Sequence, residues 1–279
     1  MMNFDLAKLQ NSLSNFLAEE SIFNLILYLV KGFKRTYIPN LLTLTNLFLG
    51  CLAIVAAFDG RLIAVPFLLL AAGFADFFDG FAARLLKVTS TIGKELDSLA
   101  DMVSFGVVPG IVIYKMLELT YMETKGIDEV ELFYLAPAFL VSICAAIRLA
   151  KFNVDERQTE KFLGLATPVA TGAIASLIWV LNDTQYATTF EPFILNLYFL
   201  YTLTLLISYL MVSEIPMFSF KFKKRGFKAN LLQIVCLIFS FSSVFIFGWA
   251  GAALIAPVYL FLVLVDNVYW SKRVEAIQL

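Results

Sequence analysis

The sequence predicts an all-α, polytopic membrane protein, and three observations lead to this fold class. The 279 residues are 60% hydrophobic, and the mean hydropathy is +0.82. Several apolar runs reach the roughly 20 residues that a helix needs to cross about 30 Å of hydrocarbon. Lysines and arginines gather in alternate connections between these runs, as the positive-inside rule expects. We therefore expect one integral membrane domain built from helices.

The N-terminal residues 1–36 differ from the rest because their apolar stretches are too short to span a membrane. Leucines and a phenylalanine recur at helical spacing over residues 3–20, and residues 22–30 are apolar. Amphipathic helices of this kind lie in the membrane interface. We expect one or two interfacial helices here, although a helix packed on a partner or on the core would give the same pattern.

Eight apolar segments follow, and each is a candidate membrane-spanning helix. The fifth is short, and little more than a Gly-Trp-Ala-Gly turn separates the last two. The segments are residues 37–58, 62–86, 94–117, 132–152, 167–182, 191–213, 229–247 and 251–270.

Charges in the connections predict the orientation of the segments. If eight segments cross and both termini are cytosolic, all but three of the 21 lysines and arginines fall on the cytosolic side. The connection at residues 118–131, on the other side, is acidic. We therefore expect a multi-pass protein of the bacterial inner membrane with both termini in the cytosol.

The composition excludes several kinds of chemistry. Histidine is absent, so a general base must be a carboxylate, Tyr, Lys or Cys. Cys51, Cys144 and Cys236 lie far apart in apolar runs without the spacing of a zinc site. The net charge of -1 gives no support for nucleic-acid binding. A catalytic metal would therefore be a hard cation bound by oxygen, such as Mg²⁺ or Mn²⁺.

Four aspartates in the second and third segments carry the strongest functional signal. Asp76 and Asp79 are three residues apart, and Asp97 and Asp101 are four apart, so each pair shares a helix face. A tight turn at residues 87–93 would fold the two pairs against each other. Bare carboxylates at membrane depth repel one another, whereas two divalent cations between them would neutralise the charge. The pairs therefore predict a metal centre at the cytosolic face.

Small residues beside the aspartates add a second signal. Gly80 and Ala83 leave the helix surface free of bulk, so a flat ring or a phosphate can approach the backbone. Arg84 follows, and a guanidinium can bind phosphate oxygens through two hydrogen bonds. A helix-packing face with ion-paired aspartates is the structural alternative, but few basic residues lie nearby. An ion path in a cation transporter is another, although all four carboxylates lie at one membrane face.

These positions together resemble the signature of the CDP-alcohol phosphotransferase family. The resemblance implies transfer of a phosphoalcohol or phosphatidyl group from a CDP-linked donor to an alcohol, with release of CMP. It also implies a six-helix core, here followed by two C-terminal spans, a dinuclear metal site and a homodimer. Asp76, Asp79 and Asp97 would be metal ligands, Asp101 a ligand or the base, and Gly80, Ala83 and Arg84 would contact the CDP part. The matching pattern is Asp76-x2-Asp79-Gly80-x2-Ala83-Arg84-x8-Gly93-x3-Asp97-x3-Asp101.

Three stretches after the aspartates are residues 102–109, 147–153 and 162–168. They resemble the phosphatidylserine synthase branch of this family, which implies CDP-diacylglycerol as donor and L-serine as acceptor. Candidate serine-binding residues are Ser104, Arg148, Lys151 and Asn153. The chain departs from that branch at Lys151, where arginine is more common, and at Ala166, where proline is. Positive-inside topology alone would also explain Arg148 and Lys151, and a capping role would explain Asn153. Acceptors carrying phosphate, such as glycerol 3-phosphate or inositol phosphate, would favour a denser basic pocket.

Thr43 and Asn46 lie three residues apart on one face of the first segment and also resemble this branch. We expect them to contact the CDP-lipid, although hydrogen bonding between helices would place the same residues there. The resemblance covers about residues 37–220, which we take as the membrane domain. Residues 1–36 form the N-terminal segment, and residues 221–279 form a basic cytosolic loop with the two C-terminal helices.

Overall fold

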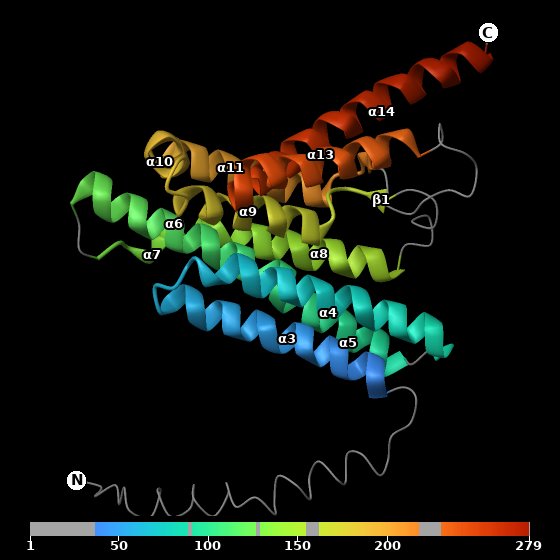
Figure 1. Cartoon of the computed structure of the whole chain (residues 1–279), viewed down its shortest axis with the longest axis horizontal. Coiled ribbons are helices and arrows are strands. Elements are labelled where there is room, and N and C mark those ends of the chain that lie inside the picture. Colours follow the sequence, from blue (N-terminus) through green and yellow to red (C-terminus); the bar gives the residue numbers. More distant parts are fainter. Residues whose placement is uncertain (1–36, 89–90, 127–128, 155–161, 218–229, 279) are drawn as a thin grey trace, which may run out of the picture.

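The computed structural model describes residues 37–88, 91–126, 129–154, 162–217 and 230–278. The predictions for residues 1–36 and for the basic loop after residue 220 therefore lie outside the described residues, apart from its end at Asn230. Within the described ranges, the predicted all-α fold class is confirmed, because helices make up nearly all of the structure (Figure 1).

Each of the eight predicted apolar segments is helical, and short irregular turns interrupt several of them. The only strands among the described residues are β1 and β2, which have two residues each and pair antiparallel. The elements are α3 (Tyr37–Phe58), α4 (Ala64–Leu86), α5 (Thr91–Asp101), the π-helical turn η1 (Met102–Val107), α6 (Val108–Lys125), α7 (Leu132–Leu135), the 3₁₀ turn η2 (Ala136–Phe139), α8 (Leu140–Val154), β1 (Phe162–Leu163), α9 (Thr167–Leu181), α10 (Ala187–Ile194), α11 (Leu197–Val212), β2 (Pro216–Met217), α13 (Leu231–Phe247), the 3₁₀ turn η4 (Gly248–Leu254) and α14 (Ile255–Gln278).

Five helical stretches are long and apolar enough to cross a membrane, and α10 with α11 makes a sixth if the bent pair is one span. The chain is thus a multi-pass membrane protein. α9 is shorter, with 15 residues. Whether all eight predicted segments cross the bilayer stays a prediction. The five stretches are Tyr37–Phe58, Ala64–Leu86, Thr91–Lys125, Leu132–Val154 and Leu231–Val268.

The sixth predicted segment, residues 191–213, is not one continuous helix. α10 and α11 meet at a bend of 71°. Asn196 stands between them and caps α11, because its side chain accepts hydrogen bonds from the backbone N–H groups of Tyr198 and Phe199. A side chain that satisfies the first N–H groups of a helix starts a new helix at that point.

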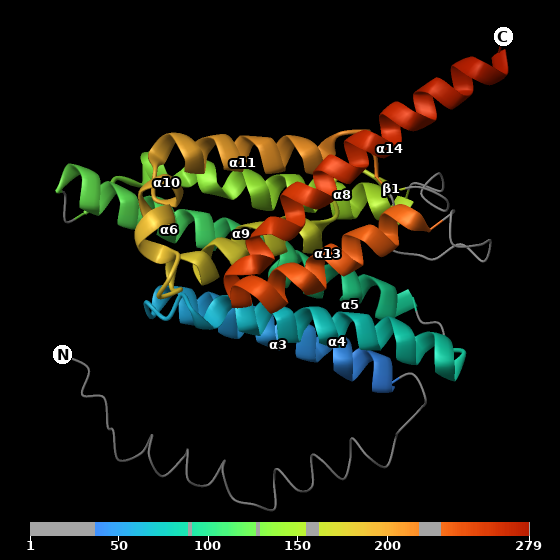
Figure 2. The same ribbon diagram turned by 45° about the horizontal axis from the view of Figure 1, so that its top comes forward.

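The last stretch folds back on itself at η4. An ideal Cβ on Gly251 would lie 2.1 Å from the backbone oxygen of Ser243, so only glycine fits this close approach. α13 and α14 therefore run side by side in opposite directions (Figure 2), and α14 extends beyond the bundle at its C-terminal end. Asn267 of α14 donates a hydrogen bond to the backbone oxygen of Pro216 at 3.0 Å, which fastens α14 to β2.

The turn between α4 and α5 is shorter than the predicted turn at residues 87–93. Lys87 ends α4 with a φ of 52°, and the N–H of Val88 donates to the Ala83 oxygen at 3.0 Å. This is the arrangement that ends many helices with a left-handed residue. α5 already begins at Thr91, so Gly93 lies inside its first turns. α3, α4 and α5 consequently pack together at one side of the bundle (Figure 1).

Candidate functional site

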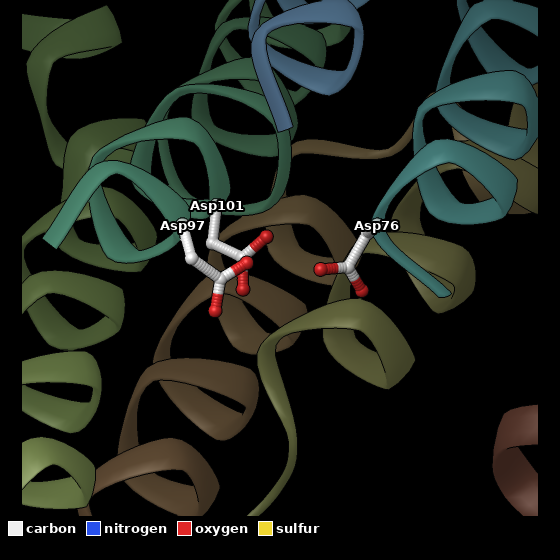
Figure 3. Close-up of side chains that lie close together, drawn as sticks. All are labelled: Asp76, Asp97 and Asp101. Atoms are coloured by element: carbon white, nitrogen blue, oxygen red, sulfur yellow. The ribbon is translucent and has the colours of Figure 1, made fainter. Parts of the chain in front are cut away.

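Three of the four predicted aspartates converge in the structure. Asp76 projects from α4, and Asp97 and Asp101 project from α5 toward it (Figure 3). One carboxylate oxygen from each lies within 4.8 Å of the others, and all three side chains are half-buried. Asp76 is in hydrogen-bonding contact with both Asp97 and Asp101. Carboxylates approach one another so closely only when a proton or a cation offsets their charge.

Asp79 lies beside this trio but has a different partner. It faces α3 and accepts a hydrogen bond of 2.5 Å from the Thr43 hydroxyl, which also donates to the Pro39 oxygen. Asp79 is buried, with 6% of its surface exposed, and remains in electrostatic contact with Asp76. Asp76 thus faces α5 and Asp79 faces α3. The hydrogen bond of Thr43 to Asp79 joins two helices, and the expected contact of Thr43 with the CDP-lipid stays a prediction.

Asn46 orients Asp101 from the first helix. Its side-chain amide donates to an Asp101 carboxylate oxygen at 3.1 Å, and its own surface is fully buried. Within the described residues, the side-chain oxygen of Asn46 has no hydrogen-bond partner, and neither does one oxygen of Asp97. Buried polar atoms without partners are unusual, so these two oxygens are candidates to pair with a bound group.

Ser104, expected at the serine site, has a packing role instead. Its side chain is fully buried, and its hydroxyl donates to the backbone oxygen of Asn46 at 3.0 Å. An ideal Cβ on Gly50 would lie 2.4 Å from the same hydroxyl, so α3 and η1 touch at this point. Ser104 therefore supports Asn46, which in turn holds Asp101.

Gly80 and Arg84 lie together on α4, one turn apart. The guanidinium of Arg84 folds back over Gly80, with its Nη1 atom 3.4 Å from where a Cβ on residue 80 would be. Arg84 is exposed, Gly80 and Ala83 are half-buried, and Arg84 is in electrostatic contact with Asp79. The absence of a side chain at Gly80 thus lets the Arg84 guanidinium lie close to the helix backbone near Asp79.

The basic residues predicted on the fourth segment separate in the structure. Arg148 of α8 is buried, with 7% of its surface exposed, and it is in electrostatic contact with Asp101. Its Nε atom has no hydrogen-bond partner in the part of the chain that the structure describes. Lys151 is exposed on the same helix, away from this buried position. Of these two residues, Arg148 is therefore the one that lies near Asp101.

Asn153 joins two helices rather than facing the aspartates. Its side-chain amide donates to the Ser98 hydroxyl at 2.8 Å, and its backbone oxygen accepts from Lys94 at 3.2 Å. These bonds tie the end of α8 to α5, next to the turn that carries Asp97. Asn153 thus helps to hold α5, the helix that carries Asp97 and Asp101, in place.

Tyr259 of α14 lies near Arg148, and nothing in the sequence predicted this position. It is 4% exposed and is in electrostatic contact with Arg148. A tyrosine in the apolar first half of α14 gives no sign of which way its ring faces. The position follows from the hairpin of α13 and α14, which brings α14 back over the bundle (Figure 2).

The aspartate trio fits a metal ion by its donor chemistry. All candidate ligands are carboxylate oxygens, the ligands that Mg²⁺ and Mn²⁺ prefer. In the parts of the chain that the structure describes, no lysine or arginine forms a salt bridge with any of the four aspartates. Because cationic side chains do not neutralise the cluster, Asp76, Asp97 and Asp101 could hold a cation.

A comparison with protein families shows which family contains this site. The family model described as CDP-alcohol phosphatidyltransferase matches residues 36–212, which is more than half of the chain. The chain belongs to the CDP-alcohol phosphatidyltransferase family. The resemblance inferred from the aspartate spacing is therefore confirmed, and the segment matched to the family contains the four aspartates and Arg148. α13 and α14 lie outside it.

Relatives in this family carry names that specify an acceptor. Proteins from Bacillus subtilis (strain 168) and Helicobacter pylori (strain 26695) are named CDP-diacylglycerol–serine O-phosphatidyltransferase. The first is 34% identical over 185 residues, covering 66% of this chain and 92% of the relative. The second is 30% identical over 203 residues, covering 71% of this chain and 79% of the relative. An archaetidylserine synthase from Methanothermobacter thermautotrophicus is 35% identical over 142 residues, covering 50% of this chain and 56% of the relative.

Proposed function

We propose that this protein transfers the phosphatidyl group of CDP-diacylglycerol to L-serine, which gives phosphatidylserine and CMP. The observation that carries the proposal is the pair of bacterial relatives named for this reaction, each covered over most of its length. The aspartate trio beside the buried Arg148 agrees with it. Phosphate-bearing acceptors would need more cationic groups than this one buried arginine provides.

The metal centre is the first part of the proposal. Asp76, Asp97 and Asp101 would hold one divalent cation, and Asp79 would share a second with them; we expect Mg²⁺ or Mn²⁺. Such ions, when bound, offset the negative charge of a diphosphate during transfer. Thr43 keeps the Asp79 carboxylate directed toward α3, and Asn46 keeps the Asp101 carboxylate in place.

Asp101 is the general base in this proposal. With histidine absent from the chain, a carboxylate is the natural group to remove the proton of the serine hydroxyl. The serine oxygen then forms a bond to the lipid-linked phosphorus, the bond from that phosphorus to the CMP oxygen breaks, and the proton stays on Asp101 until it is released to water. No covalent intermediate on the protein is required.

The substrates are held by separate groups of residues. Arg148 lies beside Asp101, so its guanidinium would bind the serine carboxylate there. Arg84 would bind the phosphate oxygens of the CDP part, and Gly80 and Ala83 would leave room for it. Lys151 is exposed and Asn153 bonds to α5, so we assign neither a direct contact with serine.

The cellular arrangement follows from the charge pattern of the sequence. We propose that the site faces the cytosol of a bacterial cell, in the inner membrane, with both chain termini on that side. CDP-diacylglycerol would arrive from the inner leaflet and serine from the cytosol. We also propose that the protein works as a homodimer, as its family resemblance implies.

The test is an acceptor comparison with purified protein in detergent–lipid micelles. Radiolabelled serine, glycerol 3-phosphate and inositol phosphate are each supplied with CDP-diacylglycerol and either Mn²⁺ or Mg²⁺. We expect serine-dependent CMP release that a chelator abolishes and added Mn²⁺ or Mg²⁺ restores. Faster turnover with glycerol 3-phosphate or inositol phosphate would refute serine as acceptor. CMP release that persists in excess chelator would refute the metal centre.

A further inference from the structure

The π-helical turn η1 begins directly after Asp101. In a π-helix each backbone N–H donates to the oxygen five residues earlier, instead of four as in an α-helix. The Val108 N–H follows this pattern and donates to the Val103 oxygen. One α-helical residue turns the chain by about 100°, so one extra residue rotates α5 relative to α6 by about that amount. η1 thus sets the direction in which Asp97 and Asp101 face. Single π turns inside α-helices are frequent at functional sites.

Pro109 removes one hydrogen-bond donor directly after this turn, because proline has no N–H. Residue 109 can therefore donate neither to the Ser104 oxygen, as in a π-helix, nor to the Phe105 oxygen, as in an α-helix. The Thr171 hydroxyl of α9 donates to the Phe105 oxygen at 2.8 Å and shares its proton with the Thr167 oxygen at 2.9 Å. Phe105 is buried, so without Thr171 its oxygen would lose a partner that water could not replace.

Ser142 of α8 supplies a second outside bond. Its hydroxyl donates to the oxygen of Gly106 at 2.8 Å. An ideal Cβ on Gly110 would lie 2.4 Å from the same hydroxyl, and one on Gly106 would lie 3.3 Å from the Cβ of Ala145. Two glycines one turn apart therefore let α8 approach closely, as small residues do between membrane helices.

A third helix completes the support of η1. Ser104 donates to the Asn46 oxygen of α3, and Asn46 donates to Asp101. The turn is therefore held from α3, α8 and α9 at once, and its first neighbour in the chain is the aspartate at the centre of the site.

We propose that Ser142 and Thr171 are positioning residues of the aspartate site. Their hydroxyls keep η1 in its π form, and the π form keeps Asp97 and Asp101 directed at Asp76. Neither side chain touches the carboxylates, so both act through the backbone of η1. The inference rests on the proposed function only for its kinetic test, because its main test is metal binding.

The experiment compares Thr171→Val and Ser142→Ala with two controls in the full-length protein. Thr171→Ser keeps the hydroxyl. Thr204→Val makes the same change at a site that is 1% exposed and whose hydroxyl donates to Leu200 of its own helix at 2.7 Å. The readouts are the Mn²⁺ dissociation constant by titration calorimetry, the thermal midpoint, and kcat and KM for serine.

We expect Thr171→Val and Ser142→Ala each to weaken Mn²⁺ binding by about tenfold, the usual scale for residues that orient metal ligands indirectly. Their kcat should fall while the KM for serine stays near the wild-type value. Thr171→Ser and Thr204→Val should keep Mn²⁺ affinity within about twofold, because both leave the bond to η1 intact.

Loss of thermal stability without loss of Mn²⁺ affinity in Thr171→Val and Ser142→Ala would overturn the proposal, since the hydroxyls would then be structural only. Equal weakening in Thr204→Val would overturn it as well. If Thr171→Val does not fold, Ser142→Ala decides the matter. A wild-type protein that binds Mn²⁺ but does not use serine would refute the proposed acceptor and leave this test intact.

Discussion

Replacing Asn46 with alanine tests how Asp101 is held. The substitution removes the side-chain amide that donates to Asp101 at 3.1 Å. It leaves the backbone oxygen that accepts from Ser104, so the packing of α3 on η1 is kept. A hydrogen bond to a charged group contributes about 1.5–3 kcal/mol. If that contribution is needed to reach the transition state, kcat falls about 10- to 150-fold at 1.36 kcal/mol per tenfold.

The assay is serine-dependent CMP release at saturating CDP-diacylglycerol and Mn²⁺, with thermal stability measured in the same micelles. Asn182→Ala is the control, because Asn182 is exposed at the end of α9 and its side-chain amide donates to the Ile178 oxygen of that helix at 2.8 Å. We expect normal turnover in that control. Turnover of Asn46→Ala within about twofold of wild type, with unchanged stability, would refute the role of Asn46 at Asp101.

Three further predictions concern the proposed metal ligands, the proposed serine site and the backbone at Gly164. Asp76→Asn and Asp97→Asn should each abolish serine-dependent CMP release while the protein still inserts into membranes; near-normal turnover of either variant would contradict the metal assignment. Arg148→Ala should chiefly raise the KM for serine, measured with CDP-diacylglycerol saturating, and an unchanged KM would remove Arg148 from the serine site. Gly164→Ala should lower the thermal midpoint, because Gly164 has a φ of 75° and a Cβ there would lie 2.6 Å from the Met211 oxygen. The left-handed conformation alone costs alanine about 1–2 kcal/mol. Gly172→Ala is the control, since nothing lies within 4 Å of its Cβ position, and an equal loss of stability in both variants would disprove the strain argument.

The aspartate cluster was predictable because spacing alone decides which side chains share a helix face. Spacings of three and four placed Asp76, Asp97 and Asp101 correctly once the chain turned between the two helices. The same reasoning did not predict that Asp79 faces α3, because the partner hydroxyl of Thr43 comes from a helix whose rotation the sequence leaves open.

The irregular parts of the fold were not predictable from hydrophobicity. The π turn depends on a proline that removes one N–H and on hydroxyls from two distant helices, so no local pattern announces it. The repeat of Gly106 and Gly110 was visible and indicates close helix packing. Asn196 was visible too, but a polar residue in a long apolar run reads equally well as an interior residue or as a cap.

The difference between Arg148 and Lys151 shows the same limit. The two are three residues apart near the end of α8, so helical phase puts them on neighbouring surfaces. In the structure Arg148 is buried and in electrostatic contact with Tyr259 of α14, whereas Lys151 is exposed. The position of Tyr259 depends on how the far end of the chain folds back, which the residues around Arg148 do not indicate.

α14 lies outside the segment matched to the family, yet it contributes a residue near the site. The match to the family ends at residue 212, yet Tyr259 lies beside Arg148 and Asn267 holds β2. A chain shortened to the matched segment would keep both the four aspartates and Arg148 but lose Tyr259, which is in electrostatic contact with that arginine. The family match therefore understates the length of chain that surrounds the site.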